Sequence, residues 1–277
     1  MRRENWHTES MLTQAEKGAA FFALHQHEDA FLIPNPWDVG TARLLAYLGF
    51  DALATTSGGF AFSNGRPDYA MERDETLAHA ASIVGATDLP VSADLENGFG
   101  DAPEDAAETI RQAASVGLVG GSIEDIPGPY AIQHAADRIR AVADVVRGLP
   151  FRFTLTARAE NYLAGRSDLN DTIKRLQAYQ EAGADVLYAP GLRTRDEIAA
   201  VVSSVDRPVN VLMKLPRAEL SAIGVKRISV GSGLSRTALG AFLRAAKEMK
   251  EHGTFEFAKD AAGYGELNSI FEEFRSS

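Results

Sequence analysis

The chain has 277 residues, of which 45% are hydrophobic and 24% are charged, a composition that is typical of globular proteins. Its formal net charge of −10 argues against nucleic acids and membrane surfaces as partners. The absence of cysteine excludes disulfides, zinc–thiolate sites and thiol nucleophiles. No apolar run approaches the roughly 18 residues of a membrane span, and no apolar segment follows the basic start at residues 1–10. We therefore expect a cytoplasmic protein.

Eight short runs rich in β-branched residues follow one another along the chain. Their near-continuous hydrophobicity is typical of parallel strands that are buried on both faces. The runs lie at 31–34, 52–56, 90–96, 121–125, 153–158, 186–190, 209–213 and 227–231. Segments of helical length separate them. We also expect a leading helix over 11–27, an eighth barrel helix over 234–251 and a helical C-terminal extension over 254–275.

A glycine recurs at the junction between a helix and the following strand. Gly49, Gly117, Gly183 and Gly224 each precede a strand by a few residues, where a left-handed conformation ends a helix without a Cβ clash. Eight such units predict a single domain over residues 1–277, a (β/α)₈ TIM barrel. The alternative is an open doubly wound sheet. That fold places a glycine-rich fingerprint after its first strand, and residues 35–38 read NPWD.

Acidic residues gather where the predicted strands end, and TIM-barrel enzymes carry their chemistry at these ends. Asp94 and Glu96 are two residues apart on one strand and should share a face. Glu124 ends the neighbouring strand. Converging carboxylates repel one another unless a proton, a hydrogen bond or a cation intervenes, and an all-oxygen set favours Mg²⁺, with Mn²⁺ possible. Helix capping or ion pairs with Arg158 are the alternative.

Three further segments have the chemistry of a substrate site. Ser57, Gly58 and Gly59 follow the second strand and present backbone N–H groups beside a hydroxyl, which suits a carboxylate; a turn that needs glycine is the other interpretation. Arg158 ends the fifth strand, where a guanidinium suits a carboxylate or an enolate, or else a structural ion pair. Asn210, near the end of the seventh strand, is expected to contact the substrate.

These segments resemble the isocitrate lyase/phosphoenolpyruvate mutase superfamily from about residue 30 to residue 250. The motifs that carry the resemblance are IPNPWDVGTARLLAYLGFDALATTSGGFAFSNGRPD, PVSADLENGFGD, GSIED, LTARAEN and AGADVLYAPGL. The resemblance implies a barrel, Mg²⁺, and the formation or cleavage of C–C or P–C bonds in small 2-oxo and 2-hydroxy acids through an enolate of pyruvate.

The resemblance also implies roles for individual residues. Segment 57–59 would hold the substrate's carboxylate or oxyanion, while Asp94, Glu96 and Glu124 would hold the metal, some of them through water. Asp68 matches an acidic residue near the metal, and Arg158 matches the family's active-site arginine; both are expected to be catalytic. Members are commonly dimers or tetramers that swap C-terminal helices. A homo-oligomer is therefore expected, and it would explain the apolar residues of the C-terminal extension.

The chain departs from the family's lyase pattern in the loop after the fourth strand. Isocitrate and methylisocitrate lyases carry a cysteine acid there, where this chain reads IEDIPGPYAIQH. The lysines and asparagine of the mutase and phosphonopyruvate hydrolase branches are absent too. The closest remaining resemblance is to the oxaloacetate decarboxylase-like branch and to phosphomutase-like proteins without an assigned reaction. It predicts cleavage of a C–C bond in a 2-oxo or 2-hydroxy (di)carboxylic acid, with Tyr130 as a candidate acid in a lyase reaction.

Two other functions remain open at this point. A phosphoenolpyruvate mutase or phosphonopyruvate hydrolase would act on a P–C bond instead. A barrel that binds 2-oxo acids as a sensor or scaffold, with little catalysis, would also fit the loop that lacks the family's acid.

Overall fold

The computed structural model describes residues 12–126 and 130–274. Residues 1–10, residue 11 of the predicted leading helix, residues 127–129 of the fourth loop and residues 275–277 lie outside the described part. Within that part, each helix is too short or too polar to cross a lipid bilayer.

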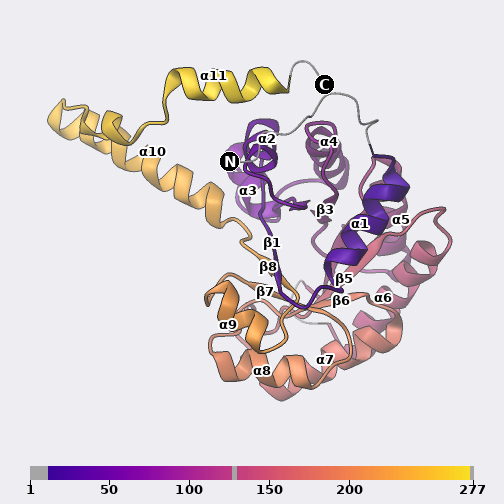
Figure 1. Cartoon of the computed structure of the whole chain (residues 1–277). Coiled ribbons are helices and arrows are strands. Elements are labelled where there is room, and N and C mark those ends of the chain that lie inside the picture. The colour runs from indigo at the N-terminus through magenta and orange to yellow at the C-terminus, as the bar shows by residue number, and fades with distance from the viewer. Residues whose placement is uncertain (1–11, 127–129, 275–277) are drawn as a thin grey trace.

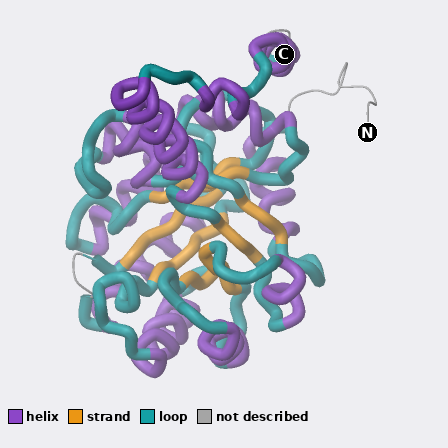
Figure 2. Tube along the Cα trace, turned by 90° about the vertical axis from the view of Figure 1, so that its left-hand side faces the viewer, coloured by secondary structure: helices purple, strands orange, loops and turns teal. Residues whose placement is uncertain are grey.

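The core of the molecule is a sheet of eight parallel strands, surrounded by helices (Figure 2). The strands are β1 (Phe31–Ile33), β2 (Leu53–Ala54), β3 (Val91–Asp94), β4 (Gly120–Glu124), β5 (Thr154–Arg158), β6 (Val186–Tyr188), β7 (Val209–Leu212) and β8 (Arg227–Ser229). Their order in the sheet is β1-β8-β7-β6-β5-β4-β3-β2. Seven strands lie within their predicted runs, β4 begins one residue before its run at Gly120, and the predicted (β/α)₈ barrel is confirmed.

The barrel closes between its first two strands through very few hydrogen bonds. In the described part of the chain β1 and β2 form no ladder, but the Ala54 amide donates to the Pro34 carbonyl at 3.1 Å. The Asn35 side chain adds to this seam, because its Nδ2 donates to the Thr55 carbonyl at 3.0 Å. Its Oδ1 accepts the amides of Val230 and Gly231, each at 2.9 Å. One asparagine thus connects the ends of β1, β2 and β8.

Helices alternate with the strands around this sheet. They are α1 (Gln14–Leu24), α2 (Val39–Tyr47), α3 (Ser57–Ser63), α4 (Arg73–Val84), α5 (Pro103–Ser115), α6 (Ile132–Arg147), α7 (Leu169–Ala182), α8 (Arg195–Ser203), α9 (Arg217–Ala222), α10 (Gly233–His252), the 3₁₀ helix η1 (Glu256–Asp260) and α11 (Tyr264–Glu273). The four glycines of the predicted turns have φ angles of +80° to +112°. The left-handed turns expected from the sequence are therefore present.

The leading helix α1 packs beneath the amino-terminal ends of the strands. Phe21 is fully buried in a small cluster with Phe31, Ala52 and Val119, which lie at or just before the starts of β1, β2 and β4. A Cβ atom at Gly18 would stand 2.2 Å from the Arg152 carbonyl oxygen, so glycine allows α1 to lie directly on backbone. The opposite mouth of the barrel is where the strands end.

Helix α10 occupies the predicted range but does not pack as the eighth barrel helix. Ser235 is its one buried residue, and Figure 1 shows the helix projecting away from the barrel before the chain returns through η1 and α11. Helix α11 then lies against α2, where Ile270 is buried and the Phe274 ring lies 5.7 Å from the Arg43 guanidinium. Within its described residues, 254–274, the predicted extension over 254–275 is thus mostly helical and only partly packed on the barrel.

Candidate functional site

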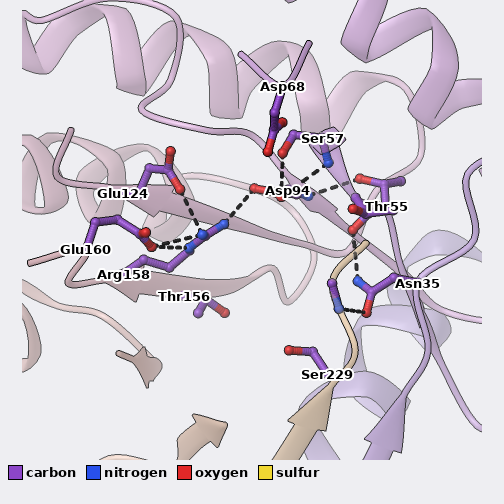
Figure 3. A network of polar contacts seen from close by, with 12 residues as sticks. Asn35, Thr55, Ser57, Asp68, Asp94, Glu124, Thr156, Arg158, Glu160 and Ser229 are labelled. Atoms are coloured by element: carbon purple, nitrogen blue, oxygen red, sulfur yellow. Dashed lines mark hydrogen bonds and ion pairs between the residues drawn. The ribbon is translucent and has the colours of Figure 1, made fainter. Parts of the chain in front are cut away.

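The ends of β2 to β5 bring the predicted polar residues to one mouth of the barrel. Asp94, Glu124 and Arg158 are the last residues of β3, β4 and β5, and Ser57 begins α3 just after β2. Because neighbouring strands are parallel, these ends meet at the same rim. Figure 3 shows Arg158 reaching toward Asp94 on one side and toward Glu124 and Glu160 on the other.

Arg158 is the centre of this arrangement. Its Nη1 donates to Asp94 Oδ1 at 2.9 Å, and its Nη2 is 3.0 Å from Glu124 Oε2. Nε and Nη2 each lie 2.8 Å from Glu160 Oε1. The guanidinium also lies over the Tyr188 ring, 5.2 Å from its centroid, a distance typical of a cation–π contact. The Arg158 side chain is 12% exposed, so these ion pairs are largely shielded from solvent.

Around Arg158 the carboxyl groups outnumber the positively charged groups. The pKa values of several of these carboxyl groups are raised. Burial raises the pKa of Glu124 well above its usual range and raises that of Glu160, although the Arg158 charge opposes both shifts. Burial, together with the charges of Asp94 and Asp68, raises the pKa of Glu96 to about 8. Burial also raises the pKa of Asp68. Burial raises the pKa of these carboxyl groups because it disfavours their ionised form. A cation bound beside them would stabilise that ionised form.

Glu96 reaches this cluster by a different route from the predicted one. Strand β3 ends at Asp94, and Glu96 lies in the turn beyond it with φ at +50°. A non-glycine residue in the left-handed region is uncommon and often marks a functional site. The sequence pattern predicted that strand alternation would place Asp94 and Glu96 on one face. Because the strand ends before Glu96, alternation does not align the two residues. The left-handed turn brings the two carboxylates close enough for their charges to interact.

The predicted segment 57–59 forms the first turn of α3. Thr56 caps this helix by accepting the Gly59 amide at 3.2 Å. Ser57 directs its amide and its hydroxyl to Asp94 Oδ2, at 3.3 and 3.1 Å, so both groups are engaged by a carboxylate of this chain. Neither glycine has a positive φ. Both are buried at close approaches instead, since a Cβ would stand 3.0 Å from Asp68 Oδ2 at Gly58 and 2.5 Å from Thr56 Cγ2 at Gly59.

Asp68 and Tyr69 come from the exposed segment between α3 and α4. Figure 3 places the Asp68 carboxylate beside Ser57, and the Ser57 hydroxyl partly offsets the raised pKa of Asp68. Tyr69 has a left-handed φ of +64°. Its hydroxyl acts on Glu124 to lower the pKa of that carboxyl but makes no hydrogen bond of ordinary geometry to it. This segment thus lies over the acidic cluster.

Asn210 is the register partner of Tyr188, which pairs with Arg158, but its hydrogen bonds go to residues outside the acidic cluster. It is the second residue of β7 rather than its end, and it is 1% exposed inside the barrel. Its Oδ1 accepts from Arg227 Nε at 2.9 Å and its Nδ2 donates to Ser229 Oγ at 3.0 Å. Its expected contact with substrate stays a prediction. The Tyr130 hydroxyl donates to Asp101 and lies 3.4 Å from Asn97 Nδ2, and its role as an acid stays a prediction.

Glu160 is a member of the cluster that the sequence pattern did not reveal. It is 1% exposed, and its amide donates to Asp125 Oδ1 at 2.8 Å. Asp125 in turn accepts from Arg175 Nη1 at 2.9 Å and from the Tyr179 hydroxyl at 2.6 Å, which fixes the backbone that carries Glu160. The position of Glu160 just after the carboxyl end of β5 was the available signal, since barrel chemistry lies at these strand ends.

The donor atoms of this cluster suit a divalent cation, although they do not form a complete, preformed metal-binding site. In the described part of the chain no three His, Cys, Asp or Glu side chains are placed to bind one ion directly, and Arg158 lies among the carboxylates. However, Glu124 is 2% exposed, and its Oε1 is buried without a hydrogen bond of ordinary geometry to any described residue. All donors are oxygens, which suits Mg²⁺ held partly through water. The metal roles of Asp94, Glu96 and Glu124 stay predictions.

Comparison with known proteins identifies sequence relatives over most of the chain. Residues 21–250 match the family described as phosphoenolpyruvate phosphomutase. An uncharacterized protein of Mycobacterium tuberculosis is 35% identical over 238 residues, which cover 84% of this chain and 89% of that protein. A 2-methylisocitrate lyase of Halalkalibacterium halodurans is 27% identical, with 91% and 88% covered. An oxaloacetate decarboxylase of Chromohalobacter salexigens is 26% identical, with 92% of each chain covered.

Solved structures show the same architecture. A candidate lyase/mutase of Burkholderia cenocepacia J2315 is 59% identical and superposes with a TM-score of 0.91, covering 93% of this chain and 96% of that one. A 2,3-dimethylmalate lyase of the PEP mutase/isocitrate lyase superfamily is 23% identical with a TM-score of 0.83, over 96% and 97% of the two chains. At that identity the second likeness concerns the fold alone.

Proposed function

Because this chain belongs to the phosphoenolpyruvate phosphomutase family, within the isocitrate lyase/PEP mutase superfamily, we propose that it cleaves a carbon–carbon bond in a small 2-oxo or 2-hydroxy (di)carboxylic acid with the help of Mg²⁺ or Mn²⁺. Relatives over nearly the whole chain are named as enzymes that act on acids of this kind. The observation that carries the proposal is Arg158, held at the carboxyl mouth of the barrel among buried carboxylates.

Arg158 supplies the positive charge at the point where the substrate would lose its bond. Its guanidinium donors can turn from Asp94 and Glu124 to a substrate carboxylate or an enolate oxygen, and two parallel N–H groups suit either one. The low exposure of Arg158 and Glu124 strengthens such contacts, because less water screens the charges. Segment 57–59 then lies beside the substrate's carboxylate end, with the Gly58 amide in the first turn of α3, where amides have no partner within the helix.

The predicted ligands Asp94, Glu96 and Glu124 would hold the cation, some of them through water. A divalent cation bound there would polarise the keto oxygen and favour the negative charge that develops on it. The residues of this chain remain the groups that orient the acid and keep water away. Glu124 and Glu160, both nearly fully buried, cover the site from below, and the segment that carries Asp68 and Tyr69 covers it from solvent.

The absence of cysteine favours decarboxylation over the release of a second acid. When the C3–C4 bond of a 2-oxo diacid breaks, its electrons remain on the enolate and CO₂ leaves without a proton. Solvent can then protonate C3. Cleavage of a hydroxy diacid instead requires a base for the hydroxyl proton and an acid for the leaving carbanion. The chain has no thiol for this step, and Tyr130 bonds to Asp101.

The test is a substrate panel with Mg²⁺ and two separate readouts. Oxaloacetate, 2-methylisocitrate, 2,3-dimethylmalate and phosphonopyruvate are incubated with the purified chain, and pyruvate and phosphate are both measured. Because Mg²⁺ decarboxylates oxaloacetate slowly by itself, the Glu124→Gln variant serves as the background. Pyruvate formation from oxaloacetate, 2-methylisocitrate or 2,3-dimethylmalate that needs Glu124 supports the proposal. Turnover of phosphonopyruvate alone, seen as phosphate release or as phosphoenolpyruvate, would overturn it in favour of P–C bond cleavage, and no turnover with any acid would favour a binding protein.

A further inference from the structure

Arg158 bonds to two different kinds of carboxylate. Asp94 and Glu124 are ligands of the proposed cation, and each accepts one edge of the guanidinium, at 2.9 and 3.0 Å. Glu160 is not one of these ligands. It accepts both Nε and Nη2 through a single oxygen, each at 2.8 Å. The guanidinium therefore bridges the cation ligands and an independent anchor.

We propose that Arg158 is a built-in counter-ion of this site, which a divalent cation displaces from Asp94 and Glu124 while Glu160 keeps the guanidinium in place. This inference rests on the proposed function, because it assumes that the cation binds these two carboxylates. It adds that Arg158 and the cation compete for the same two carboxylates, which the proposed function does not require. Binding of the cation would release the Nη edges of Arg158, and these edges would then face the substrate.

The contacts of Glu160 suit a permanent anchor. Its amide is held by Asp125, and Asp125 is held by Arg175 and Tyr179. Arg158 also keeps its contact with the Tyr188 ring, which does not involve either cation ligand. With Nε and Nη2 both on Glu160, the exchange would remove the contact of Nη1 with Asp94 and that of Nη2 with Glu124, while Nη2 keeps Glu160.

The contacts of Glu124 indicate that Arg158 neutralises the negative charge of this site only in part. One of its oxygens bonds to Arg158, while the other is buried without a hydrogen bond of ordinary geometry to any described residue. The Tyr69 hydroxyl acts on this carboxyl, but a buried oxygen without a hydrogen bond of ordinary geometry is still poorly stabilised. A cation or its water can satisfy that oxygen, whereas the single guanidinium, already shared by three carboxylates, does not.

The experiment measures Mn²⁺ binding directly, without substrate, at one fixed pH for the wild type and every variant. Loss of the competing charge in Arg158→Met should tighten Mn²⁺ binding by about tenfold or more, since unscreened like charges repel strongly at this range. Glu160→Gln should weaken it, because Arg158 then depends on Asp94 and Glu124 alone. Arg158→Lys keeps the charge and should bind Mn²⁺ like the wild type to within about threefold.

A double variant and a matched control make the outcome specific. If Glu160 acts through Arg158, the effect of Glu160→Gln should largely disappear in the Arg158→Met background. Arg227→Met removes another buried arginine of the barrel, one that makes no ion pair within the described residues, and should change the affinity far less. Circular dichroism confirms that each variant is folded.

Each outcome decides between the two proposals. Mn²⁺ affinity that is unchanged or weaker in folded Arg158→Met would overturn the counter-ion role and leave the proposed cation site standing. If Mn²⁺ binds neither the wild type nor any variant, the cation of the proposed function is wrong, and this inference is wrong with it.

Discussion

Glu124 and Arg158 face one another across two neighbouring strands, as register partners at the ends of β4 and β5, with Oε2 and Nη2 3.0 Å apart. The Glu124 side chain is 1% exposed and that of Arg158 is 12% exposed. Neither charge is stable at such a depth without the other. The pair therefore belongs to the fold as much as to the chemistry, and variants at either position must keep the shape of the side chain.

The first prediction concerns Glu124→Gln. The amide keeps an acceptor for Arg158, so we expect the variant to fold, but it removes the charge that would hold the cation. Turnover in the proposed reaction should fall by about 100-fold or more, measured as metal-dependent pyruvate formation. Glu108→Gln, an exposed change on α5, should leave turnover unaltered. Equal turnover in the two variants would remove Glu124 from the site.

The second prediction concerns the close packing at Gly59. A Cβ there would stand 2.5 Å from Thr56 Cγ2 and 3.1 Å from Trp37 Cβ, and Thr56 is the cap of α3. Gly59→Ala should therefore lower the free energy of unfolding by about 1–3 kcal/mol and weaken substrate binding, measured by urea unfolding and by KM.

Gly40 offers the matched control for Gly59. It lies in α2, where an added Cβ would meet its nearest neighbour at an ordinary 3.5 Å. Alanine is a better helix former, so Gly40→Ala should be neutral or stabilise by up to about 1 kcal/mol. A similar loss of stability in both variants would mean that the close approach at Gly59 is not the cause.

The third prediction concerns the seam that Asn35 closes. Asn35→Ala removes three hydrogen bonds and leaves the amides of Val230 and Gly231 without their acceptor. Since unsatisfied buried groups cost about 1–3 kcal/mol each, the free energy of unfolding should fall by about 2–4 kcal/mol. Asn64→Ala loses only exposed local bonds to Phe60 and Ser63 and should stay within about 0.5 kcal/mol of wild type. Denaturant unfolding of both variants gives the comparison.

Much of the barrel was predictable because its determinants are local. A run of β-branched residues indicates a strand that is buried on both faces. A glycine such as Gly183 indicates a left-handed turn, and its φ of +112° confirms that turn. The rim of the site was predictable for the same reason, since parallel strands must end together. The amino-acid sequence alone therefore suffices to place Asp94, Glu124 and Arg158 near one another.

The remaining features depend on geometry that the sequence does not express. Whether a strand residue points into the barrel, and at what depth, depends on the stagger between strands, and for this reason Asn210 lies in the interior rather than at the rim. The left-handed turn at Glu96 and the anchoring of Arg158 by Glu160 are tertiary features too. Helix α10 shows the same limit, because an amphipathic pattern does not reveal which surface the apolar face will cover.

The fourth prediction concerns that apolar face of α10. Phe242 and Leu243 are 69% and 57% exposed on a helix that projects from the barrel, and exposed apolar clusters on such a scale favour association. We propose that this helix contacts another copy of the chain. Phe242→Asp with Leu243→Asp should therefore lower the mass in light scattering, while Lys174→Asp on α7 should not. A wild-type monomer would refute this proposal.

The last prediction is a dependence of stability on pH that originates at the base of the barrel. His25 is 2% exposed beneath the strands. Its Nδ1 donates to the Phe21 carbonyl at 2.9 Å, and its Nε2 accepts from Arg227 Nη1 at 3.4 Å. Burial and the Arg227 charge, with a smaller effect from Arg152, lower the pKa of His25 to about 3.

Because the unfolded chain protonates this histidine near pH 6.5 while the folded chain resists until about pH 3, the folded state loses stability as the pH falls between these values. The loss should approach about 1.4 kcal/mol per pH unit for this group. His25→Gln cannot titrate, so its free energy of unfolding should fall less steeply with acid than that of the wild type, whatever their difference at neutral pH. Urea unfolding of both proteins above and below pH 6.5 measures this. A difference that does not change with pH would show that protonation of His25 does not contribute to acid unfolding.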